Sequence, residues 1–530
     1  MIKQFILKNS KYLMFLGIFI FYFAIALHNL THSSLWYDET IEYFFSKYFF
    51  GEIPININEE MPYQRLLSAL QPPLYNFIMY FWLKIHDSEL WFRLFGVFAG
   101  GVAIFGIYKS LLRLIDYKWA GAFCCFTVCL YNFIYYCQEC AEYNLMLCFV
   151  AWFLYFFVKL LEKITIKDTV LFVVLGSLSV GVQYGSAFCI VGAGIVLFIK
   201  ALLEKDFKAL KLLSFSYFSA FIFFALPLYW FFAKIQLTRP DMAAKVLNIH
   251  FIRNNFIFDF LSSFFHSVHY IFSCHNFHLK LNLPINFVIS QFLVFFIFIS
   301  GLLFGLIKSL KEKEQNRIFC LNITFIIVWL FYYIAVKFGF YAYGKFSNRY
   351  ELFLYPLTVI VFGTDIVFFV QNLLKTKLHN ILKGGFIWVL VCILCYFCSY
   401  NLKFICQNWE KEDYRGLVNF WYKNKLYENQ SVIYYELRHG FGYYFLNDKR
   451  YKKEYENSFV MQPWSGDTDD YQTFFKEHYG ENLPDSFYFC FGHNVNKDIY
   501  PIIISFISMG YIFEEVYEGK NVAIVLFKKI

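Results

Sequence analysis

The sequence predicts a helical membrane protein with many spans that ends in a small soluble α/β domain. Of its 530 residues, 59% are hydrophobic and only 16% are charged, whereas about a quarter of the residues in an ordinary globular protein are charged. Apolar runs of about 20 residues, the length that crosses a bilayer, recur up to about residue 402. Beyond that point, charges become frequent and the apolar runs become short and alternating.

Eleven apolar segments are long enough to be predicted as spans. They are residues 12–30, 90–112, 119–137, 143–161, 168–183, 185–201, 212–232, 284–307, 318–337, 350–371 and 385–402. A twelfth apolar segment, residues 72–85, is shorter and contains Lys84. Because about 20 residues are needed to cross the hydrocarbon core, we expect an interfacial helix there instead of a span.

The basic residues predict the orientation of these spans. With the N-terminal end inside and eleven spans, every cytoplasmic turn carries Lys or Arg, as the positive-inside rule expects. Counting residues 72–85 as a span would place Lys109 and Arg113 outside and break this pattern. The net charge of +8 therefore belongs to membrane loops, and we expect no nucleic-acid partner.

This topology predicts two domains. Residues 1–402 form a membrane domain with outer segments at 31–89 and 233–283, and residues 403–530 form a soluble domain outside the membrane. Within the soluble domain, the alternation of side chains predicts strands at residues 431–435, 487–491 and 522–527, a helix at 498–508 and a turn at 519–521.

The first outer segment contains the strongest candidate for chemistry, the adjacent carboxylates Asp38 and Glu39. Adjacent carboxylates at a membrane surface are costly unless they are solvated, paired or used. A carboxylate in this position can act as a general base or help to hold Mg²⁺ or Mn²⁺. The alternative is an acidic loop that is merely solvated.

Further candidates lie near the expected outer ends of other spans. Glu139 follows the third span and can converge with Asp38, although a carboxylate at a helix end is the simpler explanation. Candidate groups for binding a phosphate are Arg93, Arg349, Lys84 and Tyr350. A planar guanidinium matches phosphate geometry, but each of these cations can also extend to lipid headgroups.

A histidine cluster in the second large outer segment indicates a possible zinc site. His266, His269 and His278 lie close together in the sequence, with Cys274 between them. Histidine and thiolate are zinc ligands. Their spacing matches no defined zinc motif, and interfacial helices rich in aromatic residues often carry histidine, so zinc is the less favoured metal here.

Taken in order, these residues resemble the GT-C superfamily of integral-membrane glycosyltransferases. The resemblance is to the bacterial branch related to protein O-mannosyltransferases and lipid A aminoarabinose transferases. It rests on the segments Trp36-Tyr37-Asp38-Glu39, Gln71-Pro72-Pro73-Leu74-Tyr75, Trp91-Phe92-Arg93-Leu94, Gln138-Glu139 with Tyr143, Arg349-Tyr350 with Pro356, and Glu412-Asp413-Tyr414-Arg415. The sequence departs from the family at Ala141, where an Arg is frequent, and at Gln183-Tyr184, where many members have Thr-His-Tyr.

The resemblance implies transfer of a sugar from a polyprenyl-phosphate donor at the outer face of a bacterial inner membrane. It implies that Asp38 acts as a base or metal ligand, with Glu39 and Glu139 beside it. By the same resemblance, the expected ligands of the donor phosphate are Arg93, Arg349, Lys84 and Tyr350. The acceptor is left open among lipid A or another glycan, a lipid and a protein.

Two other classes remain open on the residues alone. An O-antigen polymerase or ligase would use arginine and histidine in a large middle outer loop such as 233–283. A non-catalytic glycolipid flippase or transporter would favour charges within its spans and two similar halves, but residues 212–232 carry no charge and no internal repeat is visible.

Overall fold

The computed structural model separates into two compact units. The membrane unit comprises Met1–His28, Tyr63–Trp82 and Trp91–Gln407, and the second unit comprises Asn29–Pro62, Leu83–Leu90 and Asn408–Ile530. The structure describes residues 2–51, 71–238, 256–273, 284–311, 316–338, 340–341, 348–407, 411–428, 432–435, 438–446, 459–461, 473, 483–492 and 500–530.

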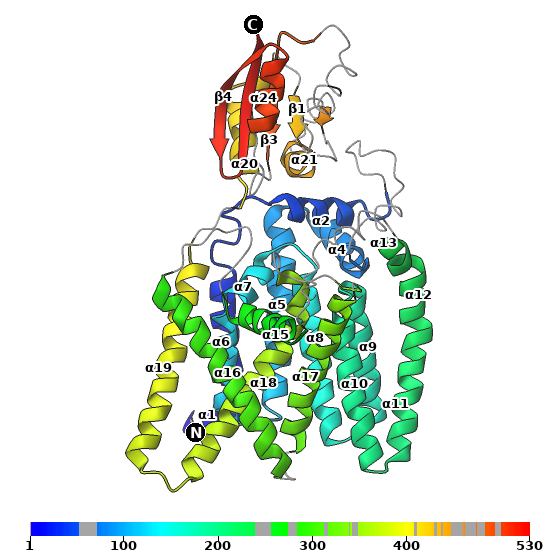
Figure 1. Cartoon of the computed structure of the whole chain (residues 1–530), viewed down its shortest axis with the longest axis vertical. Helices are drawn as coiled ribbons and strands as arrows, with labels where there is room; N and C mark the ends of the chain where they lie inside the picture. The colour runs from blue at the N-terminus through cyan, green and yellow to red at the C-terminus, as the bar shows by residue number, and fades with distance from the viewer. Residues whose placement is uncertain are drawn as a thin grey trace. The chain divides into compact units, whose positions relative to one another are not determined.

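The membrane unit is a bundle of helices, most of which run alongside one another (Figure 1). They are α1 (Ile2–Ala26), α4 (Leu74–Ile85), α5 (Glu89–Leu111), α6 (Tyr117–Val128), α7 (Tyr131–Gln138), α8 (Tyr143–Glu162), α9 (Ile166–Val182), α10 (Ser186–Leu203), α11 (Phe207–Ala220), η1 (Phe221–Ala225), α12 (Leu226–Leu228), η2 (Tyr229–Ala233), α13 (Lys234–Thr238), α15 (Phe256–Phe272), α16 (Ile285–Lys311), α17 (Asn316–Lys337), η4 (Asn348–Leu354), α18 (Tyr355–Lys375) and α19 (Asn380–Ile405).

Eight helical stretches within the described residues are long and apolar enough to cross a membrane, and the bent pair α6–α7 adds a ninth. The chain is therefore a multi-pass membrane protein, with fewer clear spans than the eleven predicted. All eleven predicted segments fall on helices. Two of the predicted spans are too short to qualify. They are α1, whose apolar part is only Ser10–Ala26, and α9, which has 17 residues.

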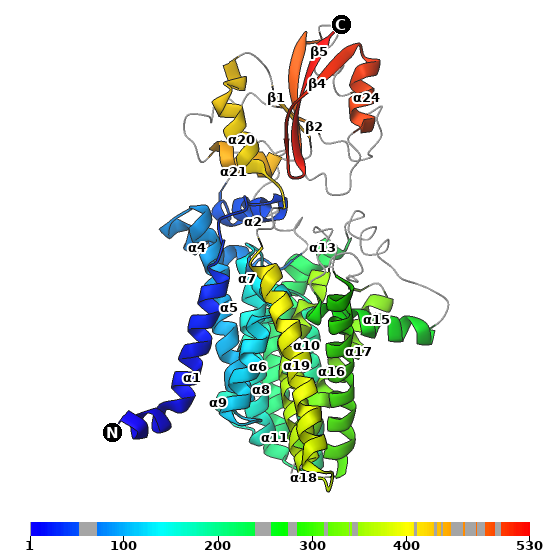
Figure 2. The same cartoon turned by 90° about the vertical axis from the view of Figure 1, so that its left-hand side faces the viewer.

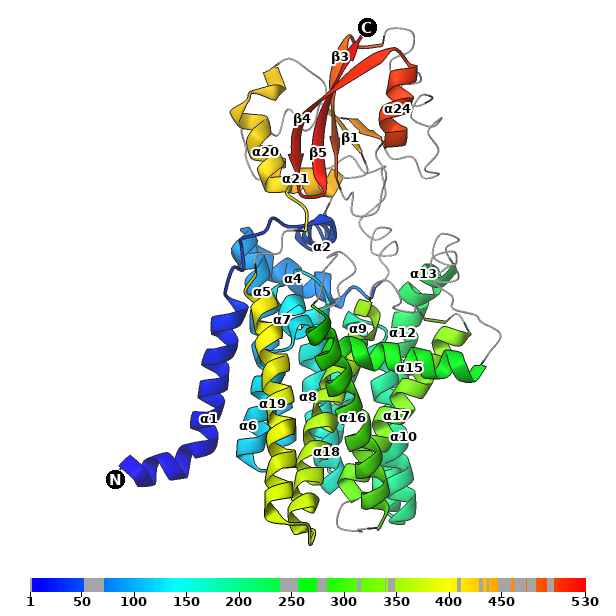
Figure 3. The same ribbon diagram turned by 60° about the vertical axis from the view of Figure 1, so that its left-hand side comes forward.

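Two helices of this unit lie across the bundle. The helix α4 is formed by the apolar segment that we expected to lie in the interface, and it is not among the helices that qualify as spans. Figures 2 and 3 show α4 and α15 at a steep angle to their neighbours. On α15, the rings of Phe260 and Phe264 contact Trp329 with centroid distances of 4.6 and 4.8 Å.

At one end of the bundle, charged side chains join three helix connections. Glu162 accepts hydrogen bonds from Arg113 at 2.7 Å and from Arg317 at 2.8 Å. Arg317 also donates to the backbone oxygen of Arg113. Three of the basic turns that the sequence predicts on one side of the membrane therefore meet in space.

The second unit contains a mixed five-stranded sheet in the order β2-β1-β3-β5-β4. Its elements are α2 (Tyr37–Lys47), α20 (Tyr414–Lys423), η5 (Leu426–Glu428), β1 (Val432–Tyr435), α21 (Arg438–Leu446), β2 (Phe459–Met461), β3 (Ser486–Phe491), α24 (Tyr500–Ser508), β4 (Tyr511–Gly519) and β5 (Val522–Lys529). The strand β1 pairs in parallel with β2 and β3, whereas β5 is antiparallel to β3 and β4.

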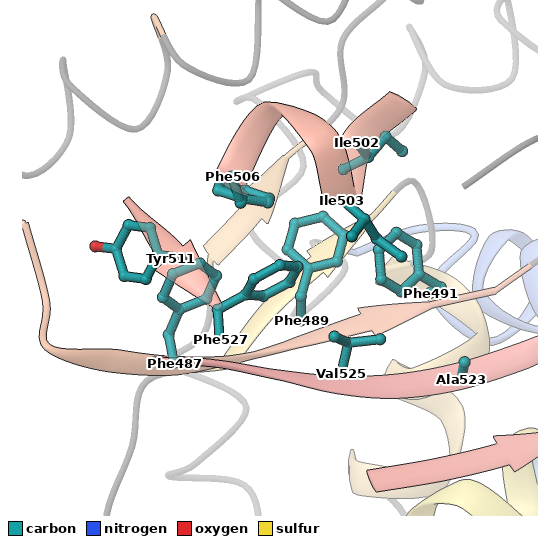
Figure 4. Close-up of a cluster of buried hydrophobic side chains, with 10 residues drawn as sticks. All are labelled: Phe487, Phe489, Phe491, Ile502, Ile503, Phe506, Tyr511, Ala523, Val525 and Phe527. Carbon is teal, nitrogen blue, oxygen red and sulfur yellow. The ribbon is translucent and has the colours of Figure 1, made fainter. Parts of the chain in front are cut away.

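Helices cover both faces of this sheet. Figure 2 shows α24 on one face and α20 with α21 on the other. Alternate residues of β3 point to the same side, so Phe487, Phe489 and Phe491 pack against α24 (Figure 4). On the other face, the ring of Trp421 lies 5.2 Å from that of Tyr488. With helices on both faces of one sheet, the tail is a three-layered α/β domain.

The structure confirms the elements that the sequence predicted in this domain. Three predicted strands coincide with β1, β3 and β5, and the predicted helix coincides with α24. The turn lies at Lys520-Asn521, where Asn521 has a φ of 52°. Two strands, β2 and β4, were not predicted.

Candidate functional site

The break between α7 and α8 is a buried acidic turn of the membrane unit. Glu139 ends α7 with extended backbone angles, and Glu142 precedes α8. Both carboxylates are buried, with exposures of 6% and 4%. The side chain of Asn144 donates to the backbone oxygen of Glu139 at 3.0 Å. Gln138, the neighbour of Glu139, donates to the last carbonyls of the first helix region, those of Ala26 and His28.

Arg93 lies on a face of α5 that packs closely against this break. Gly96 and Gly100 are three and seven residues beyond Arg93, so all three share one helix face. A Cβ atom on Gly96 would lie 2.5 Å from the backbone oxygen of Cys137, and one on Gly100 would lie 2.3 Å from its Sγ. Arg93 itself is buried, with 4% exposure. The glycines therefore let α5 carry a buried cation close to the acidic turn.

A pair of tryptophans fixes α4 against the start of α5. The rings of Trp82 and Trp91 stack at 4.3 Å with an angle of 8°. Each indole N–H donates to the backbone oxygen of the other residue, at 2.8 and 2.9 Å. Because Trp91 precedes Arg93 by two residues, this pair also sets the position of the arginine.

The short helix η4 contributes Arg349, Tyr350 and Glu351, and hydrogen bonds hold it from two sides. Gln183 donates to the hydroxyl of Tyr341 at 2.7 Å, which in turn donates to the backbone oxygen of Tyr350 at 3.2 Å. The hydroxyl of Tyr332 donates to Glu351 at 2.6 Å. Gln183, which stands at the position where related sequences often have His, therefore has a structural role in holding η4.

Tyr270 of α15 contacts α7, and the charges of three of these residues act on it. Its hydroxyl lies 3.2 Å from that of Tyr136. Burial raises the pKa of Tyr270; the hydrogen bond with Tyr136 lowers it, Glu351 and Glu139 raise it, and Arg349 lowers it again. The two carboxylates and the guanidinium therefore lie close enough to Tyr270 to act on its charge.

The Asp38-Glu39 pair begins α2 in the second unit, and its two members differ in their surroundings. Glu39 is buried, and its carboxylate accepts the backbone N–H of Trp36 at 3.2 Å. A second carboxylate, that of Glu412, accepts the backbone N–H of Tyr37 at 2.8 Å. Asp38 is half-buried. Two carboxylates thus stabilise the N-terminal end of α2, and Asp38 is a third group beside them.

Asp38 follows Tyr37 in the chain, and its charge acts on two tyrosines together with that of Glu412. Burial raises the pKa of Tyr37, and the charges of Asp38 and Glu412 raise it further. The pKa of Tyr414 is raised by burial, by Glu412 and, more weakly, by Asp38. Both phenols therefore stay protonated at neutral pH and can donate hydrogen bonds beside the two carboxylates.

Comparisons with known proteins identify the architecture. Residues 70–230 match the family model described as dolichyl-phosphate-mannose-protein mannosyltransferase. The solved structure of ArnT from Cupriavidus metallidurans in the apo state aligns over 98% of this chain and 98% of its own, with a TM-score of 0.51 and 11% identity. This chain has the GT-C fold. The fold that the motifs indicated is confirmed, and residues 70–230 resemble the mannosyltransferase family that they suggested.

Two further solved structures are similar to this chain. ArnT bound to undecaprenyl phosphate aligns over 98% of both chains, with a TM-score of 0.50 and 11% identity. The archaeal oligosaccharyltransferase AglB from Archaeoglobus fulgidus aligns over 97% of this chain and 74% of its own, with a TM-score of 0.49 and 11% identity. A search of curated protein sequences finds no match.

Within this GT-C fold, the structure divides the residues that the sequence singled out. Glu139 belongs to the acidic turn, Arg349 and Tyr350 belong to η4, and Arg93 is buried on the face of α5 that carries Gly96. Asp38, Glu39 and Lys84 belong to the second unit, where Lys84 is exposed. Sequence reasoning missed Glu351 and Tyr270, and it noted Glu412 only as part of a family motif. The signal for Glu351 was its position directly after Arg349-Tyr350.

The predicted zinc ligands are not assembled in the described part of the chain. The ring of His269 stacks on Phe265 at 5.3 Å and packs against Phe292 at 5.0 Å. His278 and the side chain of His266 lie outside the described residues. Among the residues that are described, no three His, Cys, Asp or Glu side chains are grouped so as to hold a metal ion.

Proposed function

We propose that this protein transfers a sugar from a polyprenyl-phosphate donor to an acceptor at the outer face of the membrane. The observation that carries the proposal is the match of residues 70–230 to a family model for dolichyl-phosphate-dependent mannosyltransferases. That region includes both Arg93 and Glu139. The fold agrees, because a structure of ArnT that aligns along almost the whole chain contains undecaprenyl phosphate.

In the proposed reaction, Asp38 is the general base. It takes the proton of the acceptor hydroxyl or amine as the acceptor atom forms a bond to the anomeric carbon of the sugar. The bond from this carbon to the phosphate oxygen breaks, and polyprenyl phosphate leaves with the electron pair. A single displacement of this kind inverts the configuration at the anomeric carbon.

The local structure supports Asp38 over Glu39 as the base. One oxygen of Glu39 already accepts the N–H of Trp36, and the side chain is buried. A carboxylate whose oxygen already accepts a backbone N–H at a helix end is less available to a substrate. Asp38 is more exposed, so we assign Glu39 a supporting role.

Arginines of the membrane unit are the proposed ligands of the departing phosphate. Arg93 and Arg349 supply permanent positive charge that stabilises the phosphate oxyanion as it forms. The guanidinium carbon of Arg349 lies 5.8 Å from the centre of the Tyr350 ring, an arrangement that restricts its direction. Lys84, exposed near the end of α4, is the proposed contact for the donor headgroup. Glu139 would orient the acceptor.

The carboxylates around the start of α2 are also candidate ligands for a metal ion. Asp38 with Glu39 or Glu412 offers carboxylate oxygens of the kind that Mg²⁺ and Mn²⁺ prefer. No third ligand is grouped with them among the described residues, and part of Glu39 is already engaged. The proposed reaction therefore assigns each step to the protein's own side chains.

The proposed location is a bacterial inner membrane, with α2 and the soluble domain outside. A lipid-linked donor suits this side of the membrane because its phosphate is the leaving group and no nucleotide is needed there. The acceptor remains one of the chemistries named above: lipid A or another glycan, a lipid or a protein.

The deciding experiment measures transfer of labelled sugar from undecaprenyl phosphate in membranes that contain wild-type protein, Asp38→Asn or Asp485→Asn. Asp485 is an exposed aspartate of the tail and provides a matched control. We expect Asp38→Asn to lower the rate by about 10²- to 10⁴-fold at equal protein level and Asp485→Asn to leave it unchanged.

The donors to be compared carry mannose, glucose or aminoarabinose, each with and without EDTA. Full activity of Asp38→Asn would refute the role assigned to this residue. Loss of transfer with EDTA, restored by Mg²⁺ or Mn²⁺, would establish a metal. Absence of transfer from every donor would refute the proposed function in favour of a polymerase, ligase or transporter.

A further inference from the structure

The segment that leads into the soluble domain contacts the first loop around α2 at several points. The backbone oxygen of Glu412 accepts a hydrogen bond from the hydroxyl of Ser34, and its carboxylate accepts the N–H of Tyr37 at 2.8 Å. The Nζ atom of Lys411 lies 4.0 Å from the centre of the Trp36 ring. All of these residues belong to one unit, so the contacts describe how the loop is held within it.

Arg415 ties the same segment to the residues before α2. Its guanidinium binds both carboxylate oxygens of Glu89, at 2.6 and 2.7 Å. It also donates to the backbone oxygens of Thr31 and Ser33, at 3.1 and 3.3 Å. A planar guanidinium with two partners of fixed direction holds its neighbours more firmly than a single contact.

The segment is itself anchored on the sheet of the soluble domain. Asp413 donates its N–H to the backbone oxygen of Lys520 at 3.0 Å, and Asn521 donates from its side chain to the backbone oxygen of Lys411 at 2.6 Å. The hydroxyl of Tyr517 donates to the carboxylate of Asp413 at 2.6 Å. The β4–β5 turn therefore holds the two chain neighbours of Glu412 in place.

Glu412 is fully buried, with an exposure of 0%. A buried carboxylate is costly unless its charge is used, and here the N-terminal end of α2 supplies N–H groups and a favourable helix dipole. Tyr37 is the first residue of α2, and Asp38 follows it directly. The direction of the Asp38 side chain thus depends on a hydrogen bond that comes from the soluble domain.

We propose that Glu412 is a positioning residue that fixes the first turn of α2 and thereby sets the orientation of Asp38. The soluble domain then has a role in catalysis without contacting substrate. This inference rests on the proposed function, because it takes Asp38 as the reacting base.

The test uses the ability of Glu412 to accept a hydrogen bond from the N–H of Tyr37. Glu412→Gln keeps an oxygen that can accept the N–H of Tyr37, whereas Glu412→Leu removes it. In full-length protein assayed with labelled sugar on undecaprenyl phosphate, we expect Glu412→Leu to lower kcat by about 10- to 100-fold, with the KM for the donor unchanged. Glu412→Gln is expected to lose no more than about fivefold. Glu428→Leu, which changes an exposed glutamate, is the matched control.

A second pair of variants tests the N–H group of Tyr37 and leaves Glu412 unchanged. Trp36 has φ and ψ of −90° and 175°, a conformation that a following proline accepts, and proline is well tolerated as the first residue of a helix. Tyr37→Pro and Tyr37→Ala both lack the phenol, but only the proline variant lacks the N–H. We expect Glu412→Leu to lower kcat strongly in the Tyr37→Ala background and to cause no further loss in the Tyr37→Pro background.

Hydrogen exchange of the peptide that covers α2 provides a readout that does not depend on activity. Faster exchange in Glu412→Leu, but not in Glu428→Leu, is the expected result, and it tests the positioning role even if the wild type transfers no sugar. Equal losses of kcat in the two Tyr37 backgrounds, or a Gln variant as impaired as the Leu variant, would overturn the proposal. Unchanged exchange of α2 in Glu412→Leu would do the same.

Discussion

Gly96 shows how one residue controls the position of a charged group. It lies on the face of α5 that also carries Arg93, and a Cβ atom there would be 2.5 Å from the backbone oxygen of Cys137 and 2.7 Å from Nδ2 of Asn144. A backbone oxygen cannot turn aside as the end of a flexible side chain can. Any larger residue must therefore push α5 away from the acidic turn at Glu139.

We expect Gly96→Ala to destabilise the protein by about 1–3 kcal/mol, the usual cost of overpacking, and to reduce sugar transfer because Arg93 moves. Gly384→Ala is the matched control, since nothing lies within 4 Å of a Cβ atom at Gly384. Thermal unfolding in detergent measures the first effect and the transfer assay the second. Equal behaviour of the two variants would contradict the close contact.

On the residues alone, Asp38 and Glu39 are equivalent, and only the family resemblance singled out Asp38. The two are adjacent acids in one motif, and only their contacts separate them. The structure gives Glu39 a hydrogen bond to the N–H of Trp36 and leaves Asp38 as the more exposed group. The sequence also could not predict the role of Glu412, because the helix end that it stabilises lies far away in the chain.

At the scale of elements, the junction of α4 and α5 depends on two reciprocal hydrogen bonds. We expect Trp82→Phe and Trp91→Phe each to cost about 0.5–1.5 kcal/mol, because each loses one indole N–H bond while an aromatic ring remains. Trp388→Phe, at a site on α19 that is 70% exposed, should have almost no effect. The measurement is thermal unfolding in detergent, and a loss as large in Trp388→Phe would argue against this junction.

The core of the soluble domain makes a second prediction at this scale. Phe489 is fully buried between β3 and α24, whereas Phe513 on β4 is 47% exposed. We expect Phe489→Ala to destabilise the domain by about 3–5 kcal/mol and Phe513→Ala to cost far less. Protease resistance of the tail in the full-length protein tests this difference. Similar resistance of both variants would show that the aromatic core does not hold the domain together.

The sequence predicted three of the five strands because their apolar residues are regular. The strand β4 was missed because Ile512, Phe513, Glu514 and Glu515 are all exposed, so apolar and charged residues do not alternate between an inner and an outer face. The strand β2 has only three residues, too few for a periodic pattern. Its place in the sheet comes from pairing with β1, which is a tertiary contact.

At the scale of the whole molecule, the arrangement of charge predicts the orientation. Arg113 and Arg317 meet at Glu162 at one end of the bundle, as the positive-inside rule expects of turns that share a side of the membrane. We expect alkaline phosphatase fused after Ile530 to be active outside and the same enzyme fused after Lys375 to be inactive. Green fluorescent protein at these two positions should show the opposite pattern. Active phosphatase after Lys375 would reverse the proposed topology.

The sequence by itself determined the class of membrane protein, the position of nearly every helix and the α/β character of the tail. These features follow from local hydropathy and periodicity, which need no knowledge of distant residues. The tertiary structure alone decided that Tyr136 meets Tyr270, that Gln183 holds η4 through Tyr341, and that Glu412 stabilises the start of α2. Each of these contacts joins residues far apart in the chain, and its energy comes from burial and charge that exist only once the helices are packed.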